Sequence, residues 1–249
     1  MTPAGPIQLP KPSRNLLGFC AALGASALLA ACAAPGPAAD DAGFDAVVVP
    51  DSVIEALDAA RAGNPFWTPK FKKLSYIRKT MAPKDGDRQE TVDIEAQPDG
   101  LLHRRSVAGP FDLQGLSFGG FFTLKLRVST SFEPPIYAVA SKLKLDLPTE
   151  LKPGAVLSSE LDMERWPPDA DAPVTHLISK CEVKERLDAS AFLPTLTGKV
   201  VRLDCQSTGK YVNNSTQGYF EDLGLFIPLG NPAADGSFSA VITSIGIER

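Results

Sequence analysis

The serine at position 117 lies in a pattern that supports nucleophilic chemistry. Gly115-Leu116-Ser117-Phe118-Gly119 matches G-x-S-x-G, in which a sharp turn exposes a serine hydroxyl for attack on an ester or amide carbonyl. His176 is the only histidine downstream that could act as the base. The candidate orienting acids are Asp162, Asp169 and Asp171.

The sequence around this serine does not match the fold that such chemistry needs. The nucleophile elbow requires a strand before the serine and a helix after it, whereas residues 121–128 alternate as a strand. We therefore expect Gly115, Gly119 and Gly120 to mark a turn or bulge. A serine hydrolase that uses Ser117 stays a distant alternative.

The two histidines do not form a metal-binding pattern. His103 and His176 both lack a second ligand at the short spacing that a zinc site needs. We expect His103, which two arginines follow, to lie at a solvated strand edge, and His176 to begin a strand. Phosphate-binding glycine loops of the common types are also absent from the sequence. The sequence thus predicts no metal and no cofactor.

The N-terminal segment carries the most specific pattern of the chain. Lys11 and Arg14 precede an apolar run over residues 16–31, which Leu29-Ala30-Ala31-Cys32 closes. This arrangement resembles the signal of bacterial lipoproteins. The resemblance implies that residues 1–31 are a cleaved signal peptide and that Cys32 carries acyl chains on its thiol and its new amino group. The run is short for a transmembrane helix and lacks a positive stop-transfer flank.

The same resemblance implies a location. Ala33 follows Cys32, instead of the aspartate typical of inner-membrane retention, which favours the outer membrane. The domain would then face the periplasm or the cell surface. Stable anchoring takes more than one acyl chain, and a triacylated cysteine meets that requirement. The formal net charge of −4 argues against a nucleic-acid partner.

Two cysteines remain once the signal and the anchor are set aside. Cys20 lies in the signal, which leaves Cys181 and Cys205 in a chain exported to an oxidising compartment. Alternation places both on the apolar faces of the expected strands 177–184 and 199–205. We therefore predict a disulfide between Cys181 and Cys205, which stabilises the fold by roughly 3 kcal/mol in the chain-entropy model.

A helix is expected at the start of the mature domain. Residues 33–45 are rich in alanine, proline, glycine and aspartate, and we interpret residues 32–50 as a flexible tether. Ser52-Val53-Ile54-Glu55 then fits a capping box, apolar residues follow at helical spacing, and Gly63 is placed for a C-terminal cap.

Beyond the helix, the period of the apolar residues changes to two, which is typical of strands. Turn signals such as 83–87 and 152–154 separate the runs. The absence of alternating helices predicts a mainly β domain over residues 51–249, an antiparallel sandwich or barrel, as one body or as halves at about 66–150 and 154–249. The expected strands cover residues 71–81, 89–95, 101–107, 122–128, 137–145, 156–163, 177–184, 199–205, 218–228 and 238–247.

A basic cluster lies a short distance after the predicted anchor. Its members are Lys70, Lys72, Lys73, Arg78 and Lys79, with aromatic residues interleaved. One interpretation is contact with anionic lipid head groups at the membrane surface. We favour an ordinary exposed strand face, because acidic residues nearby dilute the positive charge.

The sequence of the β domain assigns it no activity. We expect a non-catalytic interaction or structural protein that docks to another envelope protein. The alternative is a carrier of a lipid or other apolar ligand, in a cavity lined by Phe122, Leu124, Tyr219 and Phe226. We interpret residues 219–227 as a central core strand and the glycosylation-like sequons at 213–216 as a polar loop.

Overall fold

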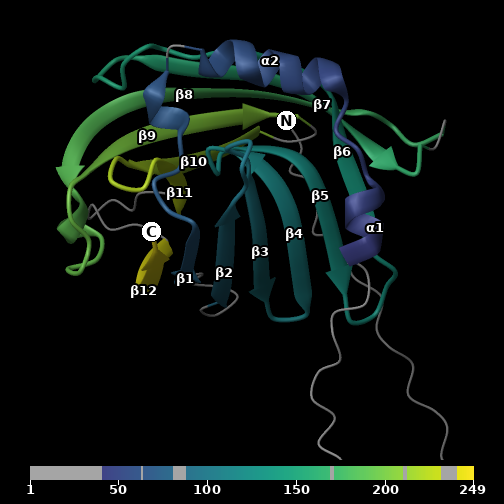
Figure 1. The fold of residues 1–249 in the computed structure, drawn as a ribbon, viewed down its shortest axis with the longest axis horizontal. Helices are drawn as coiled ribbons and strands as arrows, with labels where there is room; N and C mark the ends of the chain where they lie inside the picture. Colours follow the sequence, from purple (N-terminus) through teal and green to yellow (C-terminus); the bar gives the residue numbers. More distant parts are fainter. Residues whose placement is uncertain (1–40, 63, 81–87, 169–170, 210–211, 231–239) are drawn as a thin grey trace, which may run out of the picture. The chain divides into compact units, whose positions relative to one another are not determined.

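The computed structural model describes residues 41–62, 64–80, 88–168, 171–209, 212–230 and 240–249. The predicted signal peptide, Cys32 and residues 33–40 of the predicted tether lie outside the described residues. Residues 40–249 form one compact unit, in which strands dominate (Figure 1). No helix among the described residues is long and apolar enough to cross a membrane.

Twelve strands form a single antiparallel sheet. Each strand from β1 to β10 pairs with the next along the chain, and β12 pairs with β1. The sheet is continuous across residues 150–154, because β6 pairs with β7. The strands are β1 (Lys73–Thr80), β2 (Arg88–Ala96), β3 (Leu102–Ala108), β4 (Phe111–Phe118), β5 (Phe122–Thr130), β6 (Ile136–Asp146), β7 (Val156–Trp166), β8 (Thr175–Asp188), β9 (Lys199–Thr208), β10 (Val212–Phe220), β11 (Leu225–Gly230) and β12 (Ala240–Glu248).

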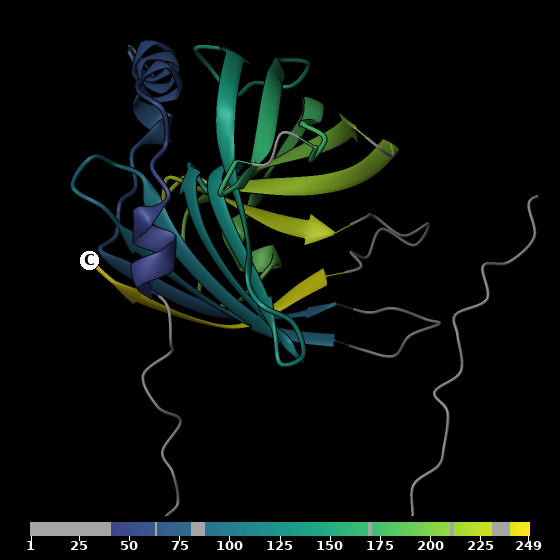
Figure 2. The same cartoon turned by 90° about the vertical axis from the view of Figure 1, so that its right-hand side faces the viewer.

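The sheet rolls into a nearly closed barrel, which confirms the predicted fold class. β11 and β12 are its two edges, and among the described residues no hydrogen-bonded ladder joins them. Figure 2 shows how the strands curl round, so that β6 to β9 lie above β1 to β4 in that view. Pro228 lies in the edge strand β11, where a missing N–H costs no ladder hydrogen bond.

Two parts of the strand pattern differ from the prediction. Residues 111–118 form the strand β4, with a bulge between Leu116 and Ser117. Residues 218–228 are not one strand, because they turn between β10 and β11. Gly224 permits this turn with a φ of 62°, and a side chain there would collide with the backbone of Thr68.

Two α-helices precede the sheet, and a 3₁₀ turn, η1 (Pro65–Trp67), follows them. α1 (Asp41–Ala46) belongs to the folded body rather than to the predicted tether, because Phe44 and Val47 are buried against β6. α2 (Asp51–Arg61) buries Val53 and Leu57, as the spacing predicted. The predicted capping box is wrong, since the N-cap is Pro50 and makes no side-chain hydrogen bond. Gly63 lies outside the described residues.

Aromatic side chains fill one end of the interior. Trp67 stacks on Phe118 and Phe226, with ring centroids 4.8 and 5.2 Å away. Phe122 and Tyr219 belong to the same cluster. We call these five residues the aromatic plug. A second apolar cluster joins β1 to β3 with β9 to β11 and with the short 3₁₀ turn η2 (Ala189–Ala191).

Candidate functional site

Three serines stand in register on the inner face of the sheet. Ser159 of β7 lies opposite Ser179 of β8, which lies opposite Ser207 of β9. Strand alternation places them on the same face as Cys181 and Cys205. Ser179 and Ser207 are each two residues away from a cysteine of the disulfide. The hydroxyls of Ser179 and Ser207 are 2.9 Å apart. We call these three residues the serine belt.

A cavity of about 260 Å³ lies against the serine belt. All three belt serines line it, and Ser215 and Gln217 of β10 add further polar groups. Its apolar walls are Phe122, Leu161 and Leu177.

A smaller cavity of about 100 Å³ adjoins it on the side of β3 to β5. The lining of the smaller cavity includes Leu113 and Leu126, and it shares Arg104, Gly120 and Thr123 with the larger one. We call the two together the interior cavity. Its lining combines apolar surface with hydroxyls and one guanidinium, which suits a ligand with both an apolar and a polar part.

Arg104 reaches the interior cavity from β3 as part of a charged network. Its Nη2 donates a hydrogen bond to Oε1 of Glu90 at 2.9 Å. Arg78 lies opposite Glu90 in the β1–β2 ladder and donates to Oε2 of the same carboxylate. The Nη1 of Arg78 lies 3.5 Å from the carbonyl oxygen of Pro228, so the network also reaches the edge strand β11.

Two guanidinium groups share one carboxylate in this network. Burial opposes ionisation of Glu90, but the attraction of Arg78 and Arg104, with a hydrogen bond from Ser106, outweighs burial and lowers the pKa of Glu90. The Nε atoms of both arginines are buried and have no hydrogen-bond partner. The network therefore carries an excess of positive charge beside the cavity.

The structure does not assemble the serine-hydrolase arrangement. Ser117 lies on the inner face of β4, where its hydroxyl is 3.4 Å from the carbonyl oxygen of Leu102. His176 does meet Asp162, with Nδ1 2.5 Å from Oδ1. His176 is on the outer face of β8, however, and four strand spacings separate β8 from β4, roughly 19 Å along the sheet. Asp169 lies outside the described residues.

Of the three glycines around Ser117, Gly119 and Gly120 form the predicted turn, whereas Gly115 lies within β4 and pairs with Arg104 and Leu126. Gly119 and Gly120 both have positive φ, at 62° and 76°, and turn the chain from β4 into β5. A Cβ on Gly119 would lie 2.6 Å from the ring of Trp67. The motif thus serves the close approach of this turn to the aromatic plug.

The other histidine lies in a different environment from the one predicted. His103 is half-buried within the sheet rather than at its edge, and its ring stacks on Phe44 of α1 with centroids 5.5 Å apart. Its Nε2 is 2.9 Å from the side-chain nitrogen of Gln114. Among the residues that the structure describes, no group of three or more histidine, cysteine or acidic side chains could hold a metal.

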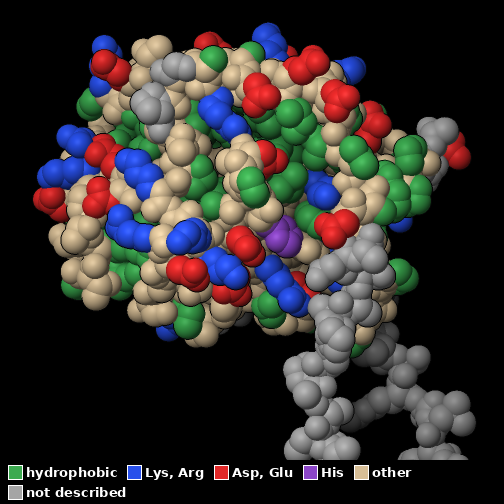
Figure 3. Space-filling model, in the orientation of Figure 1, with side chains coloured by type: hydrophobic (Ala, Val, Ile, Leu, Met, Phe, Trp, Pro, Cys, Tyr) green, Lys and Arg blue, Asp and Glu red, His purple; other side chains and the backbone are tan. Residues whose placement is uncertain are grey.

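The predicted basic cluster does not lie on one surface. Arg78 points into the interior network, while Lys73 on the same strand is exposed and lies 3.9 Å from Glu95. Lys70 donates a hydrogen bond to the carbonyl oxygen of Glu221. Lys72 and Lys79 are exposed. On the face shown in Figure 3, acidic side chains are interspersed with the basic ones.

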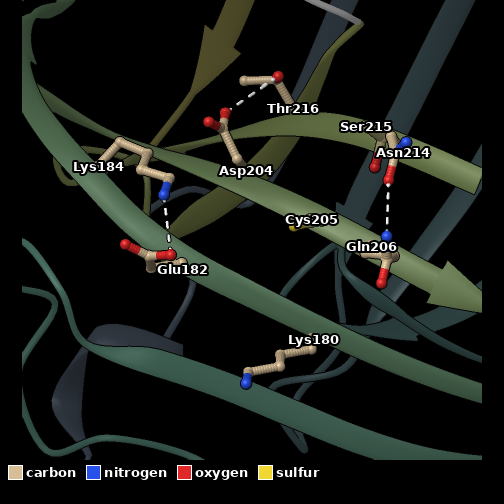
Figure 4. Close-up of a pocket in the computed structure, with 9 residues that line it drawn as sticks. All are labelled: Lys180, Glu182, Lys184, Asp204, Cys205, Gln206, Asn214, Ser215 and Thr216. Atoms are coloured by element: carbon tan, nitrogen blue, oxygen red, sulfur yellow. Dashed lines mark hydrogen bonds and ion pairs between the residues drawn. The ribbon is translucent and has the colours of Figure 1, made fainter.

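A shallow depression of about 430 Å³ lies on the outer face of β8 to β10. Figure 4 shows that its polar side chains pair with one another: Lys184 with Glu182, and Gln206 with Asn214. The predicted polar loop at 213–216 is part of β10 at this site. Because the groups pair with each other and an apolar wall is lacking among these described residues, the interior cavity is the stronger candidate site.

The predicted disulfide is present, whereas the predicted apolar lining is largely packed. Cys181 and Cys205 are bonded and lie opposite each other on β8 and β9. Leu124, Tyr219 and Phe226 are buried in the core beside the cavity, and of the four predicted lining residues Phe122 alone reaches the interior cavity. The serine belt and Arg104 were not predicted as a site, and Arg78 was predicted only as a member of the basic cluster.

Comparisons with known proteins identify no relative of this chain. The chain matches no family model, no curated protein and no solved structure.

Proposed function

We propose that this chain is a lipid-anchored envelope protein that binds a small single-chain amphiphile in its interior cavity. The observation that carries the proposal is the lining of that cavity, which Phe122, Leu161 and Leu177 share with the hydroxyls of the serine belt. Ligand sites typically combine mainly apolar walls with a few placed polar groups.

The size of the cavity limits the ligand. Pockets for drug-sized ligands hold about 300–1,000 Å³, so the larger cavity of about 260 Å³ suits one short chain rather than a two-chain lipid. Each buried methylene contributes about 0.8 kcal/mol. The predicted acyl anchor at Cys32 would keep this binding site beside the outer membrane, a source of such amphiphiles.

Native mass spectrometry of the full chain, extracted in a non-ionic detergent, tests the proposal. We expect a bound mass that differs from the mass of the detergent and disappears on denaturation. Ser179→Phe fills the serine belt and should abolish the added mass, while its neighbour Lys180→Phe, on the outer face of the same strand, should keep it. An unliganded wild-type protein that also fails to bind added medium-chain amphiphiles would overturn the proposal.

A second candidate function, docking to another envelope protein, is favoured by one surface feature. Four exposed apolar residues lie at the end of the sheet where β3 and β5 end and β4 and β6 begin: Val107, Phe111, Phe132 and Ile136. Phe132 is 85% exposed. Apolar side chains gathered at one end of a soluble domain often mark an interaction site.

Site-specific photocross-linking in cells tests this second candidate. A cross-linker at Phe132 should capture one defined envelope protein, and the same group at Lys144, exposed at the opposite end of β6, should not. Equal capture from both positions would mean nonspecific contact and would count against docking.

A further inference from the structure

Arg104 has a distinctive position in the interior cavity. Among the described residues that line its two parts, Arg104 is the one charged side chain. It belongs to both linings, so it stands where the two parts meet. Its Nη2 is engaged with Glu90, and 28% of its side chain is exposed, so the residue is not closed off from a ligand in the cavity.

The charge around Arg104 favours an anion. Arg78 and Arg104 carry two positive charges against the single negative charge of Glu90. The three side chains are 19%, 28% and 11% exposed, so water screens the excess charge only partly. A guanidinium can donate in parallel to both oxygens of a carboxylate, and such charge-assisted hydrogen bonds are about twice as strong as neutral ones.

An apolar path leads from Arg104 toward the exposed end of the sheet. Leu113 of β4 lies opposite Val128 of β5, which lies opposite Ile136 of β6, so all three share the inner face. Leu113 and Leu126 line the smaller cavity beside Arg104, and Ile136 is 46% exposed. A chain that extends from Arg104 along this path would lie on leucine and valine and end at an exposed apolar edge.

We infer that the interior cavity takes a single-chain amphiphile with an anionic head group, of the fatty-acid class, and that Arg104 binds the head group. This inference rests on the proposed function and names its ligand class. The carboxylate accepts hydrogen bonds from Arg104, Arg78 offsets the charge of Glu90, and the chain lies along Leu113 and Leu126.

Isothermal titration calorimetry with defined probes tests the inference. The full chain in lipid nanodiscs is titrated with decanoate, with decanol and with acetate, and empty nanodiscs supply the baseline. We expect decanoate to bind at least tenfold more tightly than decanol, which lacks the charge. Acetate, which lacks the chain, should bind at least a hundredfold more weakly than decanoate.

Neighbouring arginines on opposite faces of β3 provide a matched pair of variants. Arg104→Gln should weaken decanoate binding at least tenfold and leave decanol binding within twofold. Arg105→Gln removes the same charge from the outer face, where Arg105 pairs with Asp112, and should change neither. Arg104→Lys keeps the charge and should retain part of the affinity for decanoate.

The outcomes separate this inference from the proposed function. Equal affinity of the wild type for decanoate and decanol would overturn the anionic head group and leave amphiphile binding intact, whether or not the Arg104 variants fold. Acetate binding as tightly as decanoate would indicate a simple anion site and overturn the ligand class. Failure of both decanoate and decanol to bind would overturn the proposed function itself.

Discussion

At the scale of single residues, Glu90 of β2 links the two strands that flank it in the sheet. Its two oxygens accept hydrogen bonds from Arg78 on β1 and Arg104 on β3. Removing one partner of a buried ion pair usually lowers the stability of a protein by more than the intact pair contributes. The reason is that the remaining charge stays buried without a partner. Loss of the Glu90 carboxylate would leave two guanidinium groups facing each other across the interior.

This network predicts a pH dependence of stability. The pKa of Glu90 is lowered in the folded chain, whereas in the unfolded chain it returns to about 4.3. The stabilisation is therefore complete above about pH 4.3 and is lost as the pH falls toward the lowered value, because the unfolded chain then binds more protons. Urea unfolding at several pH values should show the free energy of unfolding decreasing over that acidic range.

Glu90→Gln should abolish this pH dependence and lower the free energy of unfolding by about 2 kcal/mol at neutral pH. The matched control is Glu95→Gln on the same strand, because Glu95 is exposed and lies 3.9 Å from Lys73. If Glu90→Gln keeps the acid sensitivity of the wild type, another carboxylate must cause it.

A second residue-scale prediction concerns the glycine beside the aromatic plug. Gly119→Ala adds the strain of a side chain at φ +62° and a collision with Trp67. Gly109→Ala is the matched control, since Gly109 has φ +59° and open space around the Cβ position. We expect chemical denaturation to show a cost of about 1 kcal/mol at Gly109 and about 2–3 kcal/mol more at Gly119. An equal loss of stability in the two variants would mean that Trp67 moves aside without strain.

At the scale of elements, the disulfide joins β8 and β9 beneath the serine belt. Cys181 and Cys205 enclose a loop with a sequence separation of 24, for which the chain-entropy model gives about 3 kcal/mol. The double variant Cys181→Ala, Cys205→Ala should lower the free energy of unfolding by about this amount in urea titrations. The wild type under reducing conditions should behave like the variant, and a difference of less than 1 kcal/mol would contradict the prediction.

Most elements follow from the period of apolar residues, and the exceptions have physical causes. β4 was missed because Gly115, Gly119 and Gly120 favour a turn, whereas cross-strand pairing with β3 and β5 keeps residues 111–118 extended. The β10–β11 turn was missed because its Leu223 is apolar, and the structure buries it in the second apolar cluster. Tertiary packing overrides local signals in both places.

The candidate site was only partly readable from sequence. Ser159, Ser179 and Ser207 occupy strand positions where the alternation predicts apolar residues. These three polar residues on an otherwise apolar face could have indicated the site. The ion pair between Arg104 and Glu90 could not be predicted from the sequence, because it depends on the register in which β2 pairs with β3. A single-residue slip would move every one of these side chains to the other face.

At the scale of the whole molecule, the rolled sheet arranges three environments along one axis. The aromatic plug fills one end, and the interior cavity with its charged network follows. The exposed apolar residues lie at the other end, where β3 and β5 end and β4 and β6 begin. α1 lies beside β5 and β6 in Figure 1, and its Phe44 packs on Tyr137 and Val139 of β6. Cys32 and Asp41 are nine positions apart in the sequence, so the chain from the predicted anchor to α1 can span about 30 Å when extended.

Because this segment is short, the predicted anchor would determine which ligands lie close to the interior cavity. A chain held by acyl groups within about 30 Å of a bilayer would stay beside a source of amphiphiles, whereas a released chain would sample the whole periplasm. Cys32→Ser should therefore move the protein from the outer-membrane fraction to the soluble periplasmic fraction or leave an uncleaved precursor, as fractionation and immunoblotting would show. Cys20→Ser, within the predicted signal, should leave the protein in the membrane fraction. Unchanged membrane association of Cys32→Ser would show that something other than an acylated cysteine holds the chain there, and the proposed supply of amphiphile from the bilayer would then need a different contact.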